Sequence, residues 1–271
     1  MCNQGNQKNA DRFTGFADVY DSARPAMPEY PARVICRYLG KRPDLVVDLG
    51  CGTGLSTRIW KEYCQKAVGV EPSADMLAIA CEKQTEQISF VQGFGDNTGL
   101  PDGCADAVVC SQSFHWMNPE TTLKEVDRIL ARRGVFATVD CDWPPVADWR
   151  AEEAYMKLYG KVKKLESALD DVRDTFVRYS KEKHLQNIKN SGYFAYCREI
   201  VFSNTESCTA ERFIRLLLSQ GSLQIVRKKH PEMIEDDIAA FSSYIRNLYG
   251  NEPFSMDFCY RMRLGVRGES E

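Results

Sequence analysis

The sequence predicts an α/β fold: a doubly wound, Rossmann-like, seven-stranded and mostly parallel sheet, with a helical insertion after strand five. Two observations lead to this prediction. Short β-branched runs alternate with amphipathic stretches from about residue 44 to residue 142, which is typical of βαβ units. A glycine-rich turn follows the first of these runs, where folds of this class bind a ligand.

Five strands are predicted in the first half of the chain. They are 45–49 (LVVDL), 66–71 (KAVGVE), 88–92 (ISFVQ), 105–110 (ADAVVC) and 135–141 (VFATVDC). Helices are expected at about 55–64, after a capping Ser73, and at 118–134, where Pro119 occupies the first turn and Gly134 the end. Right-handed crossovers place such helices on both faces of the sheet, with the ligand site at the carboxyl ends of the strands.

The rhythm changes after WPP (143–145). Residues 149 to about 190 are rich in charged residues and Tyr, with apolar positions at helical spacing, which fits either a solvated helix pair or a lid. Strands at 198–204 and 254–266 and helices at 209–221 and 235–250 follow. We therefore divide the chain into four parts. They are an N-terminal helical segment that covers the ligand (1–42), a ligand-binding core (43–145), a helical insertion or substrate lid (146–197) and a segment that completes the sheet with two helices (198–271).

Composition excludes several classes of function. A formal net charge of −3 provides no overall cationic field, so we do not expect nucleic acid as a partner. The eleven cysteines are irregularly spaced and odd in number, and the three histidines are far apart, so we expect reduced thiols and no metal. The opening MCNQGNQKNADRF lacks an apolar signal core and no run is long enough for a membrane helix, so we expect a cytoplasmic protein.

The turn VVDLGCGTGLS (46–56) carries the strongest signal for a ligand. Gly50, Gly52 and Gly54 follow a strand and precede a helix, where missing side chains allow close approach and positive φ. Their spacing is G-x-G-x-G, not the G-x-G-x-x-G of a dinucleotide site. Asp48 points into the same turn, where a carboxylate repels phosphate and suits an ammonium group.

Glu71 ends the second strand, where an acid can accept hydrogen bonds from both hydroxyls of a ribose. The predicted ligand therefore has a ribose and a positive centre but no phosphate. S-adenosylmethionine meets all three conditions.

With these features the chain resembles class I S-adenosylmethionine-dependent methyltransferases of the type 11 group. The matching segments are VVDLGCGTG (46–54), GVEPSADML (69–77), FVQGFGDNTGLPDGCADAVV (90–109), SQSFHW (111–116) and EVDRILARRGVF (125–136). Weaker similarity covers 16–31 and 254–265. The aromatic-His-Trp run after the fourth strand is similar to the trans-aconitate methyltransferase-like branch.

The resemblance implies a set of cofactor contacts. Asp48, Gly50, Cys51, Gly52 and Gly54 would surround the methionine moiety, Glu71 the ribose, and Pro72, Ser73 and Met76 the adenine. Asp96, preceded by Gly95, would bind the adenine amino group, and Ser111 and Gln112 would lie beside the sulfonium. Tyr20 and Arg24 would approach the cofactor carboxylate. The product would be S-adenosylhomocysteine.

The expected activity is methyl transfer to a small-molecule acceptor, on a carboxylate or hydroxyl oxygen. His115, Trp116 and Trp143 are the candidates for the substrate pocket. His115 is a general base, an orienting donor or a packed histidine, and these readings stay open. Alternatives are a methyltransferase acting on RNA or protein, and a non-catalytic binding module.

The insertion supplies further candidates for the acceptor pocket. The aromatic residues in and directly before it are Trp143, Trp149, Tyr155, Tyr159, Phe176, Tyr179, Tyr193 and Phe194. The basic residues Arg173, Arg178, Lys181 and Lys183 would either receive an anionic group or form a solvated face. The cluster RKKH (227–230) is the feature that favours RNA.

Overall fold

The computed structural model describes residues 23–269, which form one seven-stranded sheet in the order β3-β2-β1-β4-β5-β7-β6. The strands are β1 (Leu45–Leu49), β2 (Lys66–Glu71), β3 (Ile88–Gln92), β4 (Ala105–Ser111), β5 (Leu130–Cys141), β6 (Phe194–Cys208) and β7 (Phe254–Arg267). Strands β1 to β5 are parallel, and β7 lies antiparallel between β5 and β6. The predicted mostly parallel, seven-stranded sheet is confirmed.

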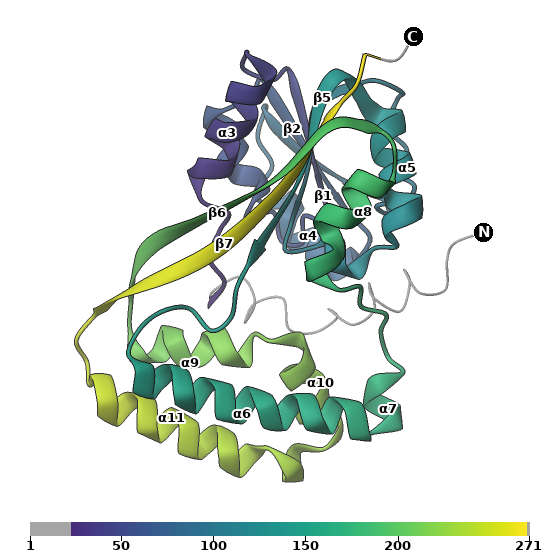
Figure 1. Cartoon of the computed structure of the whole chain (residues 1–271). Coiled ribbons are helices and arrows are strands. Elements are labelled where there is room, and N and C mark those ends of the chain that lie inside the picture. Colours follow the sequence, from purple (N-terminus) through teal and green to yellow (C-terminus); the bar gives the residue numbers. More distant parts are fainter. Residues whose placement is uncertain (1–22, 270–271) are drawn as a thin grey trace.

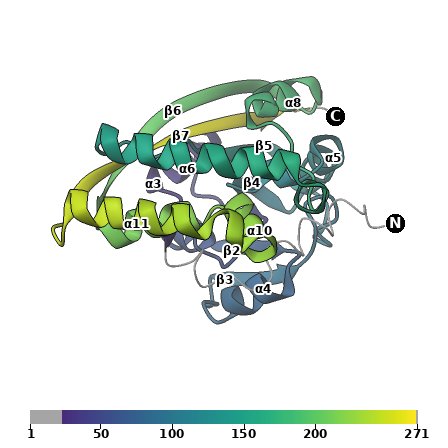
Figure 2. The same ribbon diagram turned by 90° about the horizontal axis from the view of Figure 1, so that it is seen from below.

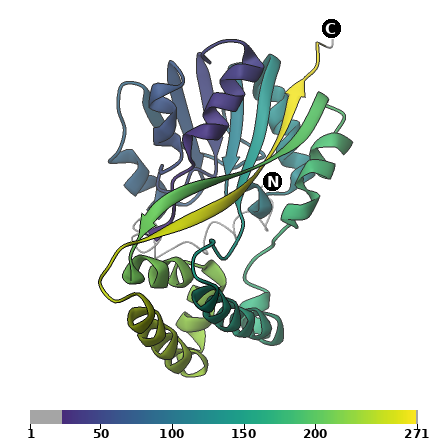
Figure 3. The same ribbon diagram turned by 60° about the vertical axis from the view of Figure 1, so that its left-hand side comes forward.

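Both faces of the sheet are covered by helices, as the nearly continuous burial of β1, β4 and the second half of β5 requires. In β1, Val46 joins one apolar cluster and Val47 the other. Helix α3 (Glu29–Leu39) and the 3-10 helix η1 (Thr57–Glu62) pack in the first cluster. Helices α5 (Pro119–Ile129) and α8 (His184–Asn190) pack on the opposite side of the sheet, as Figures 1 and 3 show. Helix α4 (Ala74–Cys81) follows β2.

Five further helices form a layer beyond one end of the sheet, which we call the helical cap (Figures 1 and 2). They are α6 (Trp149–Ala168), α7 (Asp170–Arg173), α9 (Ala210–Leu218), α10 (Gly221–Lys229) and α11 (Glu235–Tyr249). Buried aromatic rings join α6, α9 and α11, with the centroid of Phe213 6.1 Å from that of Tyr155 and 6.4 Å from that of Phe241. Within residues 23–269, none of the helices is sufficiently long and apolar to cross a membrane.

The cap comes from two separate segments of the chain. The predicted insertion supplies α6 and α7, but its last helix, α8, packs against the sheet instead. Helices α9, α10 and α11 lie between β6 and β7, in the segment predicted only to complete the sheet. The prediction joined residues 209–221 into one helix and missed α10, because Ser219 and Gln220 separate α9 from α10.

Three local predictions are wrong. The helix expected at 118–134 ends at Ile129, and Leu130 is already paired with Ala105 before a bulge shifts the register to Val135. The helix expected at 55–64 is the short 3-10 helix η1. Ser73 stands at the N-cap position of α4, but its side chain forms no capping hydrogen bond. Three further 3-10 turns are η2 (Phe114–Trp116), η3 (Lys181–Lys183) and η4 (Pro231–Met233).

Helix α5 depends on a side-chain cap that can be tested. The Asn118 side chain accepts hydrogen bonds from the backbone N–H groups of Glu120 and Thr121, at 3.0 and 3.3 Å. Asn118→Ala should lower the free energy of unfolding by about 1 kcal/mol, since two terminal N–H groups lose their acceptor. Asn118→Asp keeps the acceptor and is the control. Equal losses for both variants in urea denaturation would show that the cap does not stabilise α5.

Candidate functional site

A cavity of about 930 Å³ lies between the carboxyl ends of the parallel strands and the helical cap. Its sheet side is formed by Gly50–Thr53 after β1, Glu71 and Pro72 at β2, Ser111–Ser113 at β4, and Asp140–Trp143 at β5. Its cap side includes Tyr159 of α6 and Ser219–Ser222 at the junction of α9 and α10. The sequence-based prediction of a ligand site at the carboxyl edge of the sheet is therefore matched by a cavity.

The three positions of the first turn require glycine for different physical reasons. A Cβ on Gly50 would lie 2.7 Å from the Cβ of Ser113, and one on Gly54 would lie 2.7 Å from the Phe90 ring. These two positions therefore exclude a side chain because of packing. Gly52 has φ +58° with no atom within 4 Å of such a Cβ, and it lines the cavity. Gly52 is where the missing side chain leaves room for a ligand.

Glu71 joins the end of β2 to this turn. Its carboxylate accepts one hydrogen bond from the backbone N–H of Gly52 and one from that of Ser73, both at 2.9 Å. Burial raises the pKa of Glu71 to about 7, although both hydrogen bonds oppose the rise. Each carboxylate oxygen keeps a further lone pair for a donor in the cavity.

Asp48 lies behind the same turn, where its carboxylate accepts a hydrogen bond from Thr57 Oγ1 at 2.7 Å. Burial raises its pKa to about 7, and the charge of Glu71 adds to this rise. Among the described residues neither carboxylate forms an ion pair. A ligand with a positive charge near this end of the cavity would therefore stabilise both carboxylates.

The predicted cofactor residues divide into two groups by position. Those that line the cavity are Arg24, Gly50, Cys51, Gly52, Glu71, Pro72, Met76, Gly95, Ser111 and Gln112. Asp48, Gly54, Ser73 and Asp96 are outside this lining, and Asp96 accepts a hydrogen bond from Thr121 Oγ1. Tyr20 lies outside the described residues. Arg24 donates to the carbonyl of Ser219 at 3.1 Å and lies over the Trp143 ring, so it faces the cap.

The far half of the cavity contains the predicted pocket residues His115, Trp116 and Trp143, together with Tyr159 and Tyr179. Other aromatic residues expected there lie elsewhere. Trp149 is 71% exposed, and Tyr155 is buried in the cap, where its hydroxyl accepts a hydrogen bond from Gln220. Phe176 contacts Trp116 from outside the lining, while Tyr193 and Phe194 pack in the sheet core. Hydrophobicity alone did not distinguish a cavity wall from a core.

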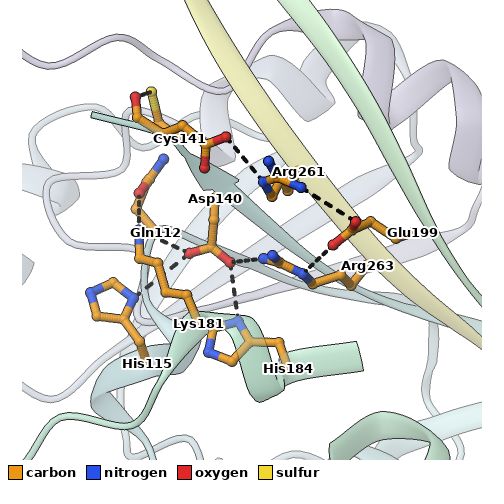
Figure 4. A network of polar contacts seen from close by, with 10 residues as sticks. Gln112, His115, Asp140, Cys141, Lys181, His184, Glu199, Arg261 and Arg263 are labelled. Atoms are coloured by element: carbon orange, nitrogen blue, oxygen red, sulfur yellow. Dashed lines mark hydrogen bonds and ion pairs between the residues drawn. The ribbon is translucent and has the colours of Figure 1, made fainter. Parts of the chain in front are cut away.

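A charged network that the sequence did not predict centres on Asp140, at the end of β5 (Figure 4). Its carboxylate lies 3.2 Å from Lys181 Nζ, 3.2 Å from Arg263 Nη1 and 3.1 Å from His184 Nδ1. His115 Nδ1 lies 3.7 Å away. Burial opposes ionisation, but Lys181 and the His184 hydrogen bond hold the pKa of Asp140 well below its usual range.

The network extends to β6 and β7. Glu199 of β6 pairs with Arg263 at 2.8 Å, and Arg261 of β7 pairs with Asp142 at 3.0 Å. These residues come from segments far apart in the sequence, so only strand pairing brings them together. The one signal in the sequence was the alternation of Arg261 and Arg263 in a predicted strand, which places both on one face.

The predicted basic residues are separated by the fold. Arg178 and Lys181 line the cavity, while Arg173 and Lys183 are exposed outside it. Arg178 lies 4.9 Å from the Trp116 ring centroid, and burial lowers its pKa.

The RKKH cluster (227–230) faces acidic residues at the far end of α10. Arg227 pairs with Glu235 at 2.6 Å, and His230 lies 3.1 Å from Asp171. Lys229 also contacts Asp171. This pairing reduces the positive potential that a phosphate backbone would meet there.

Comparison with known proteins agrees with the strand order. Residues 47–138 match the family model described as "Methyltransferase domain". Beyond that segment the sheet continues with β7, which lies antiparallel between β5 and β6. Residues 47–138 carry a methyltransferase domain.

Relatives of this methyltransferase domain occur in fungi. The chain is 30% identical over 174 residues to a "Probable S-adenosylmethionine-dependent methyltransferase" of Saccharomyces cerevisiae, covering 60% of this chain and 59% of that protein. An "Uncharacterized methyltransferase-like" protein of Schizosaccharomyces pombe is 24% identical over 92% of this chain and 91% of its own length. The chain spans about half the length of the first curated relatives it matches, 59%, 46% and 51%.

Solved structures share the fold beyond the glycine turn. A "Putative Type II Methyltransferase" from Anaeromyxobacter dehalogenans superposes with a TM-score of 0.68 at 19% identity, over 90% of this chain and 97% of that chain. The YcgJ protein from Bacillus subtilis has a TM-score of 0.52 at 20% identity, over 86% of this chain and 99% of that one. The trans-aconitate methyltransferase-like branch stays a prediction.

The role of Gly52 can be separated from backbone strain. Gly52→Ala and Gly103→Ala introduce the same methyl group at φ +58° and φ +60°, and neither Cβ has an atom within 4 Å. Both should lower the free energy of unfolding by a similar amount, about 1–2 kcal/mol. Only Gly52→Ala should weaken binding of S-adenosylhomocysteine in calorimetry, because Gly52 lines the cavity. Unchanged affinity would remove Gly52 from the binding surface.

Proposed function

We propose that the chain is an S-adenosylmethionine-dependent methyltransferase that acts on a small-molecule acceptor bound beneath the helical cap. One observation carries the proposal. A single cavity runs from the cation-favouring turn at Gly52 and Glu71 to the aromatic half at Trp116 and Trp143. Its volume, about 930 Å³, lies within the range of small-molecule sites. A methyl donor and its acceptor would therefore share one cavity.

The donor fits the end of the cavity at β1 and β2. Glu71 offers two acceptor oxygens to ribose hydroxyls, and Met76 and Pro72 provide apolar surface for the adenine. Gly52 leaves space beside the methionine moiety, and Asp48 contributes negative charge from behind the turn. Ser111 and Gln112, at the end of β4, would then border the sulfonium.

The donor supplies an activated methyl group, so the protein chiefly aligns the acceptor and excludes water. The cap provides both. Tyr159 and Ser219–Ser222 line the cavity on the cap side. Arg24 donates a hydrogen bond to the carbonyl of Ser219, at the α9–α10 junction. The aromatic rings of Trp116 and Trp143 offer flat apolar surfaces that would hold an acceptor beside the sulfonium.

A macromolecular acceptor is supported less well. The cluster that favoured RNA, 227–230, is paired with Asp171 and Glu235 at the far end of α10. Tyr159 and Ser219–Ser222 of the cap also line the cavity, which favours a small molecule over a duplex or a folded protein surface. We keep the cytoplasm as the proposed location, on the cysteine pattern described above.

The proposal is tested in two measurements on the full chain. Calorimetry should detect binding of S-adenosylmethionine and S-adenosylhomocysteine. A screen with methyl-labelled donor against small carboxylic acids, phenols, alcohols and RNA should then label a small molecule. Labelling of RNA would overturn the small-molecule assignment, and failure to bind either nucleoside would overturn the proposed function as a whole.

The affinity for S-adenosylhomocysteine should depend on pH through Glu71. Its pKa in the free protein is raised to about 7, whereas ribose hydroxyls bind the ionised carboxylate. Binding must therefore release a proton below pH 7, so affinity should be constant above about pH 8 and fall as pH decreases to 5.5. The affinity should fall by at most roughly tenfold per pH unit, because binding releases one proton from Glu71.

The control for this pH dependence is Glu71→Gln, which cannot titrate. Its affinity should be lower than that of the wild type at pH 8, and its pH dependence shallower, with the remainder due to Asp48. Equal wild-type affinities at pH 5.5 and pH 8 would contradict the assignment of Glu71 to the ribose.

A further inference from the structure

His115 is held at the acceptor end of the cavity by backbone and ring contacts. It lies in η2, directly after β4, is 7% exposed and lines the cavity. Its carbonyl accepts a hydrogen bond from the backbone N–H of Tyr179 at 2.8 Å, and its ring lies 4.7 Å from that of Trp116. The imidazole therefore has a defined orientation, with Nδ1 toward Asp140 and the other ring nitrogen pointing away (Figure 4).

The two atoms that face each other across this contact are both buried. His115 Nδ1 has no hydrogen-bond partner among the described residues. Asp140 Oδ1 accepts no hydrogen bond there either, but it forms the ion pair with Lys181 Nζ at 3.2 Å. His115 Nδ1 and Asp140 Oδ1 lie 3.7 Å apart, about 0.8–1.0 Å longer than a charge-assisted N–H···O bond. A small movement would convert the pair into a hydrogen bond, and a positive charge on the imidazole would favour that movement.

Groups on several elements decide the charge of His115. Burial lowers its pKa well below the usual value, and Lys181 of η3, Arg178 and His184 of α8 lower it further. Asp140 of β5 acts in the opposite direction. The imidazole is therefore neutral near pH 7, so one ring nitrogen has a free lone pair. A base in this state needs no prior deprotonation.

The polar lining indicates the chemistry of the acceptor. Each basic side chain in the acceptor half has a partner within the protein: Arg24 with the Ser219 carbonyl, Arg178 with Glu166 and Ser222, Lys181 and Arg263 with Asp140, and Arg261 with Asp142. An anionic acceptor would have to compete with a carboxylate at Arg178, Lys181, Arg261 and Arg263, and with a backbone carbonyl at Arg24. A neutral molecule with an aromatic or apolar body would meet Trp116, Trp143, Tyr159 and Tyr179 without that cost.

From this arrangement we propose that His115 is the general base for a neutral acceptor that carries a hydroxyl group, with Asp140 as its positioning residue. The inference rests on the proposed function and specifies its substrate class. It separates a phenol or alcohol acceptor from a carboxylic acid, which would need no base.

The proposed step balances in atoms and charge. The acceptor O–H bond breaks and its proton passes to Nε2 of His115, while an oxygen lone pair forms the new O–CH₃ bond. The bond between the methyl carbon and sulfur breaks, and its electron pair stays on sulfur. One cation disappears as the imidazolium appears, so the net charge within the cavity is constant. Asp140 Oδ1 accepts a hydrogen bond from the Nδ1–H of that imidazolium. The imidazolium later loses its Nε2 proton to water.

The first test needs no acceptor and no variant with lost activity. The chain has only three histidines, so ¹⁵N–¹H NMR of imidazole-labelled protein can resolve each ring. His115 should be neutral at pH 7 and carry its proton on Nδ1, facing Asp140. A protonated ring, or a neutral ring with the proton on Nε2, would overturn the proposal, because no lone pair would then face the acceptor.

The second test uses His115→Gln and, as a matched control, His184→Gln. His184 also contacts Asp140, at 3.1 Å, but it is 0% exposed and outside the cavity lining. With a phenol or alcohol acceptor, His115→Gln should lower kcat about 10²–10⁴-fold at similar KM and remove the acidic limb of the kcat–pH profile. His184→Gln should keep that limb. An acidic limb that persists in His115→Gln would show that His115 is not the base.

Asp140→Asn tests the positioning role separately. It should move the pH profile and the His115 tautomer together, a coupling that loss of a structural contact would not produce. An unchanged tautomer would contradict the role of Asp140.

Failure of this inference is distinguishable from failure of the proposed function. If S-adenosylhomocysteine binds but the labelled methyl group goes to carboxylic acids and not to matched phenols or alcohols, the hydroxyl class is wrong and the methyltransferase stands. If neither nucleoside binds, the proposed function fails first.

Discussion

The need to compensate one buried negative charge organises the acceptor side of this molecule. Asp140 ends β5 almost out of contact with solvent, and an unpaired carboxylate there would cost several kcal/mol. Lys181, His184 and Arg263 meet it from η3, α8 and β7. The same interaction therefore holds the chain after α7 against the sheet edge and closes one side of the cavity.

The opposite end of the cavity has the reverse electrostatic character. Asp48 and Glu71 are also buried, but only hydroxyl and backbone N–H groups of the described residues reach them, and burial raises the pKa of both. Cationic side chains of the protein thus compensate the charge of Asp140, whereas a bound cationic ligand would compensate the charges of Asp48 and Glu71. The two ends of the cavity therefore suit different ligands, with the proposed donor at β1 and β2 and the acceptor beneath the cap.

The cap shows how one domain combines a common sheet with a particular pocket. The sheet residues at the cavity lie at the carboxyl ends of the strands, where open α/β sheets bind their ligands. The cap residues come from α6 and from the junction of α9 and α10, two segments joined by aromatic packing around Phe213. Specificity for an acceptor therefore depends on contacts between distant segments, whereas the donor site is built from local turns.

The sequence by itself determined the parallel core, its five strands and the glycine turn, because periodicity and turn chemistry are local properties of the chain. It also placed Glu71 and His115 at strand ends that face one edge. It did not distinguish Tyr159, which lines the cavity, from Tyr155, which is buried in the cap, since both occur at helical spacing in one segment. Only the tertiary structure decided the composite cap and the Asp140 network, because antiparallel pairing of β7 with β5 and β6 brings together residues more than a hundred positions apart.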